Sequence, residues 1–129
     1  MTANLIAFLR ARLDEDEAVA RAASPGPWRP DEEGDEVLAV DGIVVAEGFA
    51  LSGRQLRATV DHIARHDPAR VLAEVEAKRR IVQAHAKWCE GRCEAKYPEG
   101  GFDAAHYWSV KSLAAVYADH PDYREGWRP

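Results

Sequence analysis

The sequence predicts a mostly helical α+β fold, with about four helices and one small β-hairpin near residues 36–47. Two observations lead to this prediction. Apolar residues recur at helical spacing in four separate segments, and between the first and second segments the spacing changes to that of strands. The chain of 129 residues is 47% hydrophobic and 30% charged, which predicts a single domain, residues 1–129, with one core.

The first helix is predicted over residues 2–22, where Leu5, Leu9 and Leu13 repeat at helical spacing. Residues 24–27 follow it and contain two prolines and a glycine. These residues interrupt helices, so we expect the helix to end before them.

The β-hairpin prediction rests on two runs of β-branched residues on either side of Asp41 and Gly42. An Asp-Gly pair favours the positive φ angles of a tight, two-residue type I′ turn. The preceding residues 28–34 contain charges and chain breakers, and we expect them to form a loop pinned by Trp28.

The second and third helices are marked by their caps. Ser52 can cap a helix that runs to His66. Asp67 is a good N-cap for a third helix, and Pro68 suits the first helical position because the N–H that it lacks has no helical partner there. The third helix is predicted to end at about Trp88.

The last helix is predicted to start at a cap formed by Asp103 and to continue through Tyr117. Residues 120–129 lack periodicity and contain aromatic side chains. We expect Tyr123 and Trp127 to pin this tail across the core.

The net charge of −5 argues against general attraction to nucleic acid or to an anionic membrane. Residues 54–96 are nevertheless basic, with ten basic and six acidic side chains, a net +4. A basic helical surface can bind phosphates, which makes a DNA-binding accessory protein one hypothesis. Acidic residues interrupt this surface and favour a solvated, ion-paired helix face instead. The basic residues concerned are Arg65, Arg70, Lys78, Arg79, Arg80 and Lys87.

The chain contains no run of about 18 apolar residues and no signal-peptide core, so we expect a cytoplasmic protein that does not insert into membranes. Its two cysteines, Cys89 and Cys93, are four residues apart. In a reducing compartment, metal binding or reduced thiols are better interpretations of such a pair than a disulfide.

The first candidate site is a zinc centre formed by His85, Cys89, Cys93 and His106. His85 and Cys89 are four apart at the end of a helix and so share one face, while Cys93 follows a glycine-containing turn that can fold it back. Two cysteines and two histidines are a common ligand set for structural zinc. His106 is the natural fourth ligand. The alternative is two reduced thiols and two surface histidines.

The second candidate site is the pair His62 and His66, whose i, i+4 spacing places two imidazoles on one helix face, with Asp61 or Asp67 as a third ligand or as the group that orients an imidazole. Ile63 follows the first histidine where zinc proteases of this type have a catalytic glutamate. The alternative is that His66 complements the helix dipole and Asp67 caps the next helix.

Three functions are consistent with these features. The leading hypothesis is a small binding or regulatory module with a structural zinc site, which presents its helices to a protein partner or to a second copy as a homodimer. The second is a metal-dependent, hydrolase-like enzyme that uses His62 and His66. The third is the DNA-binding accessory protein. The sequence contains no phosphate-binding loop and no recognisable catalytic nucleophile.

Three segments resemble a family of small uncharacterised actinobacterial proteins, a domain of unknown function also met in mobile elements and phages. They are Phe8-Leu-Arg-Ala-Arg-Leu-Asp-Glu-Asp-Glu, the block from His62 to Val82 that contains Lys-Arg-Arg-Ile, and Tyr117-Ala-Asp-His-Pro-Asp-Tyr-Arg-Glu-Gly-Trp-Arg-Pro. The resemblance implies a bacterial cytoplasmic protein and no particular activity.

The same resemblance implies a set of zinc ligands. Members of the family often carry a His or Cys pair after the Lys-Arg-Arg-Ile helix and a further Cys before the last helix. Cys89 and Cys93 match the pair. No third cysteine follows Pro98 in this chain, and His106 stands close to the position where that ligand is expected.

Overall fold

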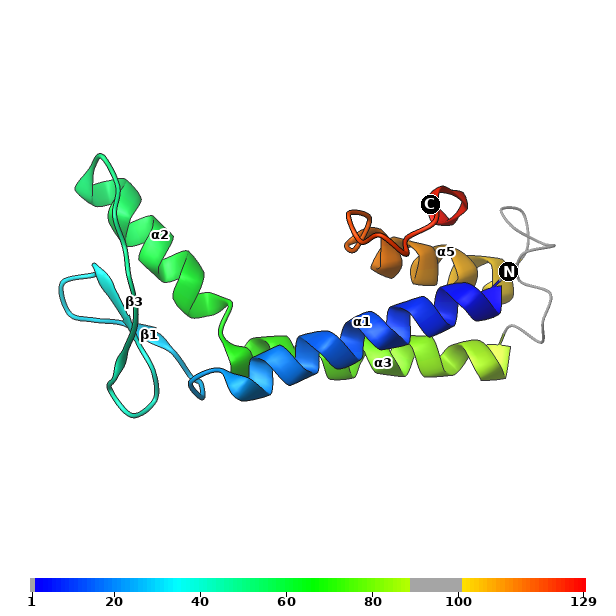
Figure 1. The fold of residues 1–129 in the computed structure, drawn as a ribbon, viewed down its shortest axis with the longest axis horizontal. Helices are drawn as coiled ribbons and strands as arrows, with labels where there is room; N and C mark the ends of the chain where they lie inside the picture. Colours follow the sequence, from blue (N-terminus) through cyan, green and yellow to red (C-terminus); the bar gives the residue numbers. More distant parts are fainter. Residues whose placement is uncertain (1, 89–100) are drawn as a thin grey trace. The chain divides into compact units, whose positions relative to one another are not determined.

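The structure is a computed structural model that describes residues 2–88 and 101–129. Its elements are α1 (Thr2–Ala22), β1 (Arg29–Pro30), β2 (Glu36–Leu38), β3 (Val44–Glu47), α2 (Gly53–Arg65), α3 (Pro68–Trp88), α5 (Phe102–Ala115) and a final 3-10 turn, η1 (Glu125–Trp127) (Figure 1). The mostly helical α+β fold predicted from the sequence is confirmed.

The chain divides into two compact units. The middle unit is Asp16–Glu74, and the terminal unit combines Met1–Glu15 with Val75–Pro129. The helices α1 and α3 each contribute to both units. A single domain over residues 1–129 stays a prediction.

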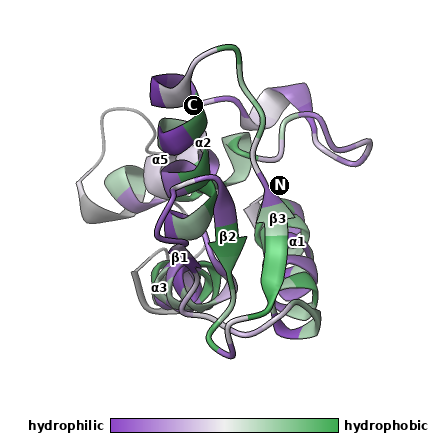
Figure 2. Cartoon of the chain, turned by 90° about the vertical axis from the view of Figure 1, so that its left-hand side faces the viewer, coloured by the Kyte–Doolittle hydropathy of each residue, from purple (hydrophilic) through white to green (hydrophobic). Residues whose placement is uncertain are grey.

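A three-stranded antiparallel sheet in the order β1-β2-β3 forms the middle unit together with α2. Figure 2 shows the hydrophobic residues that run along β3. Val37 on β2 pairs with Ala46 on β3. Val37 packs with Val60 and Ala64 of α2 in a buried cluster. The sheet therefore buries one face against α2 through residues that alternate along its strands.

The hairpin lies where the sequence predicts it, but its turn is different. The Ala39 N–H donates to Ile43 O (2.9 Å), and the Gly42 N–H donates to Ala39 O (2.9 Å). This pattern leaves a three-residue loop, residues 40–42, which ends at Gly42 with φ +83°. The predicted two-residue type I′ turn is therefore wrong. One positive φ, at the glycine, is enough for the loop that forms.

The segment expected to be a loop at residues 28–34 contains the short strand β1. Arg29 pairs with Leu38, and Pro30 pairs with Val37. Two residues are too few for a strand periodicity, and the pairing with β2 defines this strand. Pro30 has no N–H to donate, which a sheet tolerates at an edge strand such as β1.

Gly48 allows the chain after β3 to pass close to α2. A Cβ atom at this position would lie 2.6 Å from Val60 Cγ2 and 2.8 Å from Leu56 Cδ1. Neither distance is possible for real atoms without a shift of the neighbours. The absence of a side chain at Gly48 therefore permits the close packing of sheet and helix.

Both predicted helix caps of the middle unit form. The Gln55 N–H donates to Ser52 Oγ (3.2 Å) at the start of α2. At the start of α3, the Arg70 N–H donates to Asp67 Oδ1 (2.8 Å), while Asp67 Oδ2 accepts from the Trp28 N–H (2.9 Å). One buried carboxylate thus caps a helix and anchors the predicted Trp28 segment.

The core of the terminal unit comes from three helices and the tail. Its buried apolar residues are Leu5, Ile6, Phe8, Leu9, Leu13, Val75, Val82, Ala104, Val110, Ala114 and Trp127. The helix α5 begins at Phe102 with Gly101 as its N-cap, so the predicted cap at Asp103 lies one residue inside the helix. The N-cap residue is Gly101, which has no side chain that could cap the helix.

The tail packs on α1 through aromatic side chains, as the sequence predicts. The Phe8 ring lies 5.1 Å from the Trp127 ring and 5.9 Å from the Tyr123 ring, measured between centroids. It also makes edge contacts with Tyr117 and His120. Trp127 is buried in the turn η1.

The two longest helices, α1 and α3, contain 21 residues each. Charged side chains occur throughout both. No helix within residues 2–88 and 101–129 combines the length and the apolar character needed to cross a membrane.

Candidate metal centre

The structure brings together the two histidines of the predicted zinc centre. His85 lies near the end of α3 and His106 in the second turn of α5. Their rings are stacked, with centroids 5.5 Å apart and an angle of 28° between planes. The two residues are separated by 20 others in sequence, so helix spacing alone did not specify this contact.

His106 is buried, with 6% of its surface exposed. Burial lowers the pKa of His106, and repulsion from His85 lowers it further. Both effects favour the neutral imidazole. A neutral imidazole is the form that binds a metal ion.

The other two predicted ligands, Cys89 and Cys93, lie outside the described residues. Cys89 follows Trp88, the last residue of α3, directly in sequence. Within the part of the chain that is described, no group of three or more His, Cys, Asp or Glu side chains is placed to hold a metal ion. The four-ligand zinc centre therefore stays a prediction, supported by the contact between its two histidines.

The second candidate site contains a pair of histidines and two neighbouring aspartates. The aspartate carboxylates form contacts with other groups. The His62 and His66 rings lie on α2 and at its C-cap, with centroids 4.3 Å apart. Asp61 pairs with Arg65 (3.1 Å), and Asp67 accepts two backbone N–H groups. Within the described residues, no third His, Cys, Asp or Glu side chain joins this pair in a group that could hold a metal ion, as the enzyme hypothesis requires.

Within its described part, residues 54–88, the basic segment contains several ion pairs. Arg65 pairs with Asp61, Arg70 with Glu74 (3.0 Å) and Arg80 with Glu76 (3.6 Å), each within one helix. Arg79 of α3 pairs with Asp14 of the acidic first helix (2.7 Å). These contacts agree with a solvated, ion-paired face, and they reduce the positive charge available to a nucleic acid.

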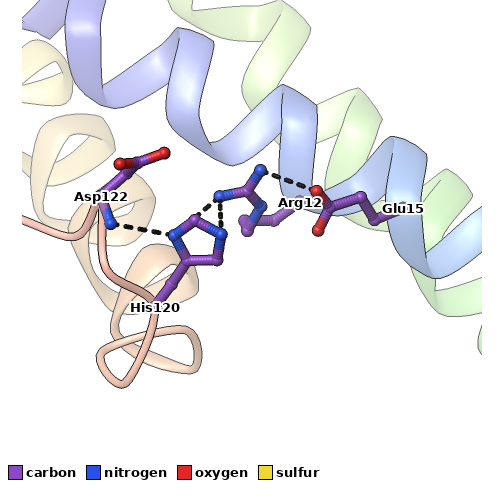
Figure 3. Close-up of polar contacts among 4 residues, drawn as sticks. All are labelled: Arg12, Glu15, His120 and Asp122. Carbon is purple, nitrogen blue, oxygen red and sulfur yellow. Dashed lines mark hydrogen bonds and ion pairs between the residues drawn. The ribbon is translucent and has the colours of Figure 1, made fainter.

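A polar network that the sequence analysis did not identify joins α1 to the tail (Figure 3). Arg12 Nη1 lies 2.9 Å from His120 Nδ1 and 2.5 Å from His120 Nε2, and Arg12 Nη2 donates to Glu15 Oε1 (2.9 Å). The Asp122 N–H donates to His120 Nδ1 (3.0 Å). Arg12 is 9% exposed.

The sequence did carry a signal for this network. Arg12 falls within the apolar spacing of Leu5, Leu9 and Leu13, where the core lies. A cation on the core-facing side of a helix needs a partner because an unpaired buried charge is costly. The guanidinium also lies 5.1 Å from the centre of the Phe8 ring, which attracts its charge. The network therefore holds the tail on α1.

The loop between β1 and β2 concentrates negative charge. Asp31 Oδ1 accepts the N–H groups of Gly34 (2.8 Å), Asp35 (3.0 Å) and Glu36 (3.1 Å). Burial raises the pKa of Asp31, but these three hydrogen bonds and one with the Asp35 side chain together outweigh it and leave the pKa lowered. The pKa of Asp35 is raised by its hydrogen bond with Asp31, by burial and by repulsion from Asp31 and Glu33. This loop is thus a site of mutual repulsion.

The model of a family of unknown function, DUF6221, matches residues 2–129, so the chain belongs to this family. No curated protein and no solved structure matches the chain. The family carries no assigned activity, and an actinobacterial origin stays a prediction from the sequence.

Proposed function

We propose that this member of family DUF6221 is a small binding module whose terminal unit is stabilised by a structural zinc ion. The ligands would be His85, Cys89, Cys93 and His106. The contact between the two histidine rings carries this proposal, because a metal centre requires these side chains to meet and the fold brings them within 5.5 Å.

Two further observations support a structural role for zinc. The burial of His106 and its lowered pKa favour the uncharged ligand that zinc needs. A zinc ion bound by α3, α5 and the two cysteines would also link two of the three helices of the terminal unit. Such a link stabilises a small unit because the binding energy of the metal is coupled to folding.

The zinc proposal is tested by elemental analysis of tag-free protein purified without chelator. We expect one zinc ion per chain in the wild type and in His62→Ala, and loss of zinc in Cys89→Ser and His106→Ala. The His62→Ala variant is the matched control because it removes an imidazole from the middle unit. Absence of zinc from the wild type, or full zinc content in both ligand variants, would contradict the proposal.

The binding role is supported by large apolar side chains exposed in the middle unit. Phe49 is 84% exposed and Leu51 is fully exposed, both in the segment between β3 and α2. Ile43, in the hairpin loop, is 63% exposed. Exposed apolar side chains of this size are typical of surfaces that bind another protein when they form a patch.

The oligomeric state tests whether a second copy binds to these side chains. We expect sedimentation equilibrium to show a mass that rises with protein concentration, and the variant Phe49→Ser/Leu51→Ser to remain monomeric. Val19→Ser is the matched control, since Val19 is 72% exposed on α1. A wild type that stays monomeric at all concentrations would contradict self-association and leave a different protein as the partner.

The two other hypotheses lack an observation in their favour. An enzyme at His62 and His66 needs a third ligand, and the part of the chain that the structure describes contains no such group of three. A DNA-binding role needs cationic side chains that are free to contact phosphates, whereas four of the arginines concerned form ion pairs.

A further inference from the structure

The histidine pair of the middle unit has the geometry of a small metal chelate. His62 and His66 are one helical turn apart, and both are exposed. Their ring centroids are 4.3 Å apart, with an angle of 39° between the planes. Side chains at i and i+4 lie on the same face of a helix, so both rings can reach one ion from the same side.

The hydrogen bonding of His66 fixes which ring nitrogen is available. His66 Nδ1 lies 2.7 Å from the backbone oxygen of His62. A carbonyl oxygen can only accept a hydrogen bond, so Nδ1 carries the proton and the lone pair is on Nε2. Metal-binding histidines commonly donate their second ring N–H to a backbone carbonyl, which orients the ring. His66 already has this arrangement.

The site has two protein ligands, because no group of three or more His, Cys, Asp or Glu side chains that could hold a metal ion occurs among the described residues. Asp61 and Asp67 are engaged with Arg65 and with backbone N–H groups respectively. Imidazole ligands suit Zn²⁺, Ni²⁺ and Cu²⁺, whereas Mg²⁺ and Ca²⁺ require oxygen ligands. An ion at this pair would therefore be a first-row transition metal with its other coordination positions open.

We propose that His62 and His66 form an exchangeable binding site for a divalent transition metal ion. The ion is held by Nε2 of His66 and a ring nitrogen of His62, and water fills the remaining positions. This site belongs to the middle unit, and it does not depend on the structural zinc proposed for the terminal unit. Its open positions would accept a donor group from a second molecule.

The experiment is a titration of the full chain, loaded with one equivalent of Zn²⁺, with Cu²⁺, followed by calorimetry and by NMR. Paramagnetic Cu²⁺ broadens the signals of nearby amides, so we expect broadening at substoichiometric Cu²⁺ to centre on residues 59–69. We expect His62→Ala and His66→Ala each to weaken binding at least tenfold, because the loss of even a group that only orients a metal ligand costs about 10–100-fold. Mg²⁺ should cause no change.

Asp61→Asn is the matched control, because it changes an exposed residue next to His62 and leaves both imidazoles in place. It should bind Cu²⁺ as the wild type does, within twofold. His62→Gln repeats the test with a side chain of similar size. The proposal is overturned if either histidine variant binds as tightly as the wild type, or if Asp61→Asn weakens binding as much as they do. Broadening centred away from α2 would also overturn it.

Discussion

Removal of the Asp67 carboxylate is expected to destabilise the middle unit because its two oxygens serve different backbone groups. Oδ1 accepts the Arg70 N–H at the start of α3, and Oδ2 accepts the Trp28 N–H 39 residues earlier in the chain. The residue is only 7% exposed. Water therefore cannot easily replace either bond.

The magnitude follows from these two contacts. Loss of an N-cap costs about 1 kcal/mol, and a backbone N–H left without a partner away from water costs about 1–3 kcal/mol. Asp67→Ala loses both and should cost about 2–4 kcal/mol in the free energy of unfolding. Asp67→Asn keeps one oxygen, which can satisfy only one of the two N–H groups, and should cost about 1–2 kcal/mol.

The assay is urea denaturation followed by circular dichroism, with the slope of the transition unchanged among the variants. Amide hydrogen exchange at Trp28 gives a local measurement, and exchange there should become faster in both variants. Asp61→Ala is the control, because its ion pair with Arg65 is exposed and contributes less than about 1 kcal/mol. Equal stability of Asp67→Asn and the wild type, or of Asp67→Asn and Asp67→Ala, would refute this reasoning.

Three other substitutions test packing and charge. Gly48→Ala should cost about 1–3 kcal/mol in urea denaturation because its Cβ would overlap with Val60. Trp127→Ala should cost about 3–5 kcal/mol in the same assay because a buried aromatic ring leaves a cavity. Glu36→Gln should stabilise the protein at neutral pH. Burial raises the pKa of Glu36, and repulsion from Asp31 and neighbouring carboxylates raises it further. Because the pKa of Glu36 is raised in the folded state, the wild type loses stability as the pH rises through that pKa and the carboxyl ionises. Below the ordinary value of 4.5 the carboxyl is protonated in both the folded and the unfolded state. The gain in stability of Glu36→Gln should therefore disappear there.

Two of these substitutions have a control variant, and the third is checked by its pH dependence. For Gly48→Ala the control is Gly126→Ala, where an added Cβ meets nothing within 4 Å. For Trp127→Ala it is Trp108→Ala, which removes a half-exposed ring and should cost about half as much as Trp127→Ala. A Glu36→Gln variant whose stability relative to the wild type is the same at pH 7 and at low pH would contradict the electrostatic explanation.

The sequence predicts those features of the fold that depend on a few consecutive residues, such as helix caps. Ser52 and Asp67 cap the predicted helices because a cap depends on one side chain and the next three residues. The strand β1 was not predictable, since Arg29 and Pro30 become a strand only by pairing with β2. The turn type of the hairpin also depended on the register between β2 and β3, which the Asp-Gly pair alone does not fix.

The candidate site divides in the same way. Helix periodicity placed His62 beside His66, four residues apart on one face, and the structure confirms that contact. The sequence selected His106 as a partner of His85 from its residue type and from a family resemblance. Only the packing of α5 against α3 decided that the two rings would meet.

The sequence by itself determined the helices, the position of the hairpin and the caps of α2 and α3, because each depends on neighbours within a few residues. The tertiary structure alone decided the contacts between distant segments, such as Arg12 with His120 and Asp67 with Trp28. The physical reason is that these polar pairs form where packed helices and loops exclude water and bring their groups within hydrogen-bonding distance. No periodicity in the sequence encodes that distance.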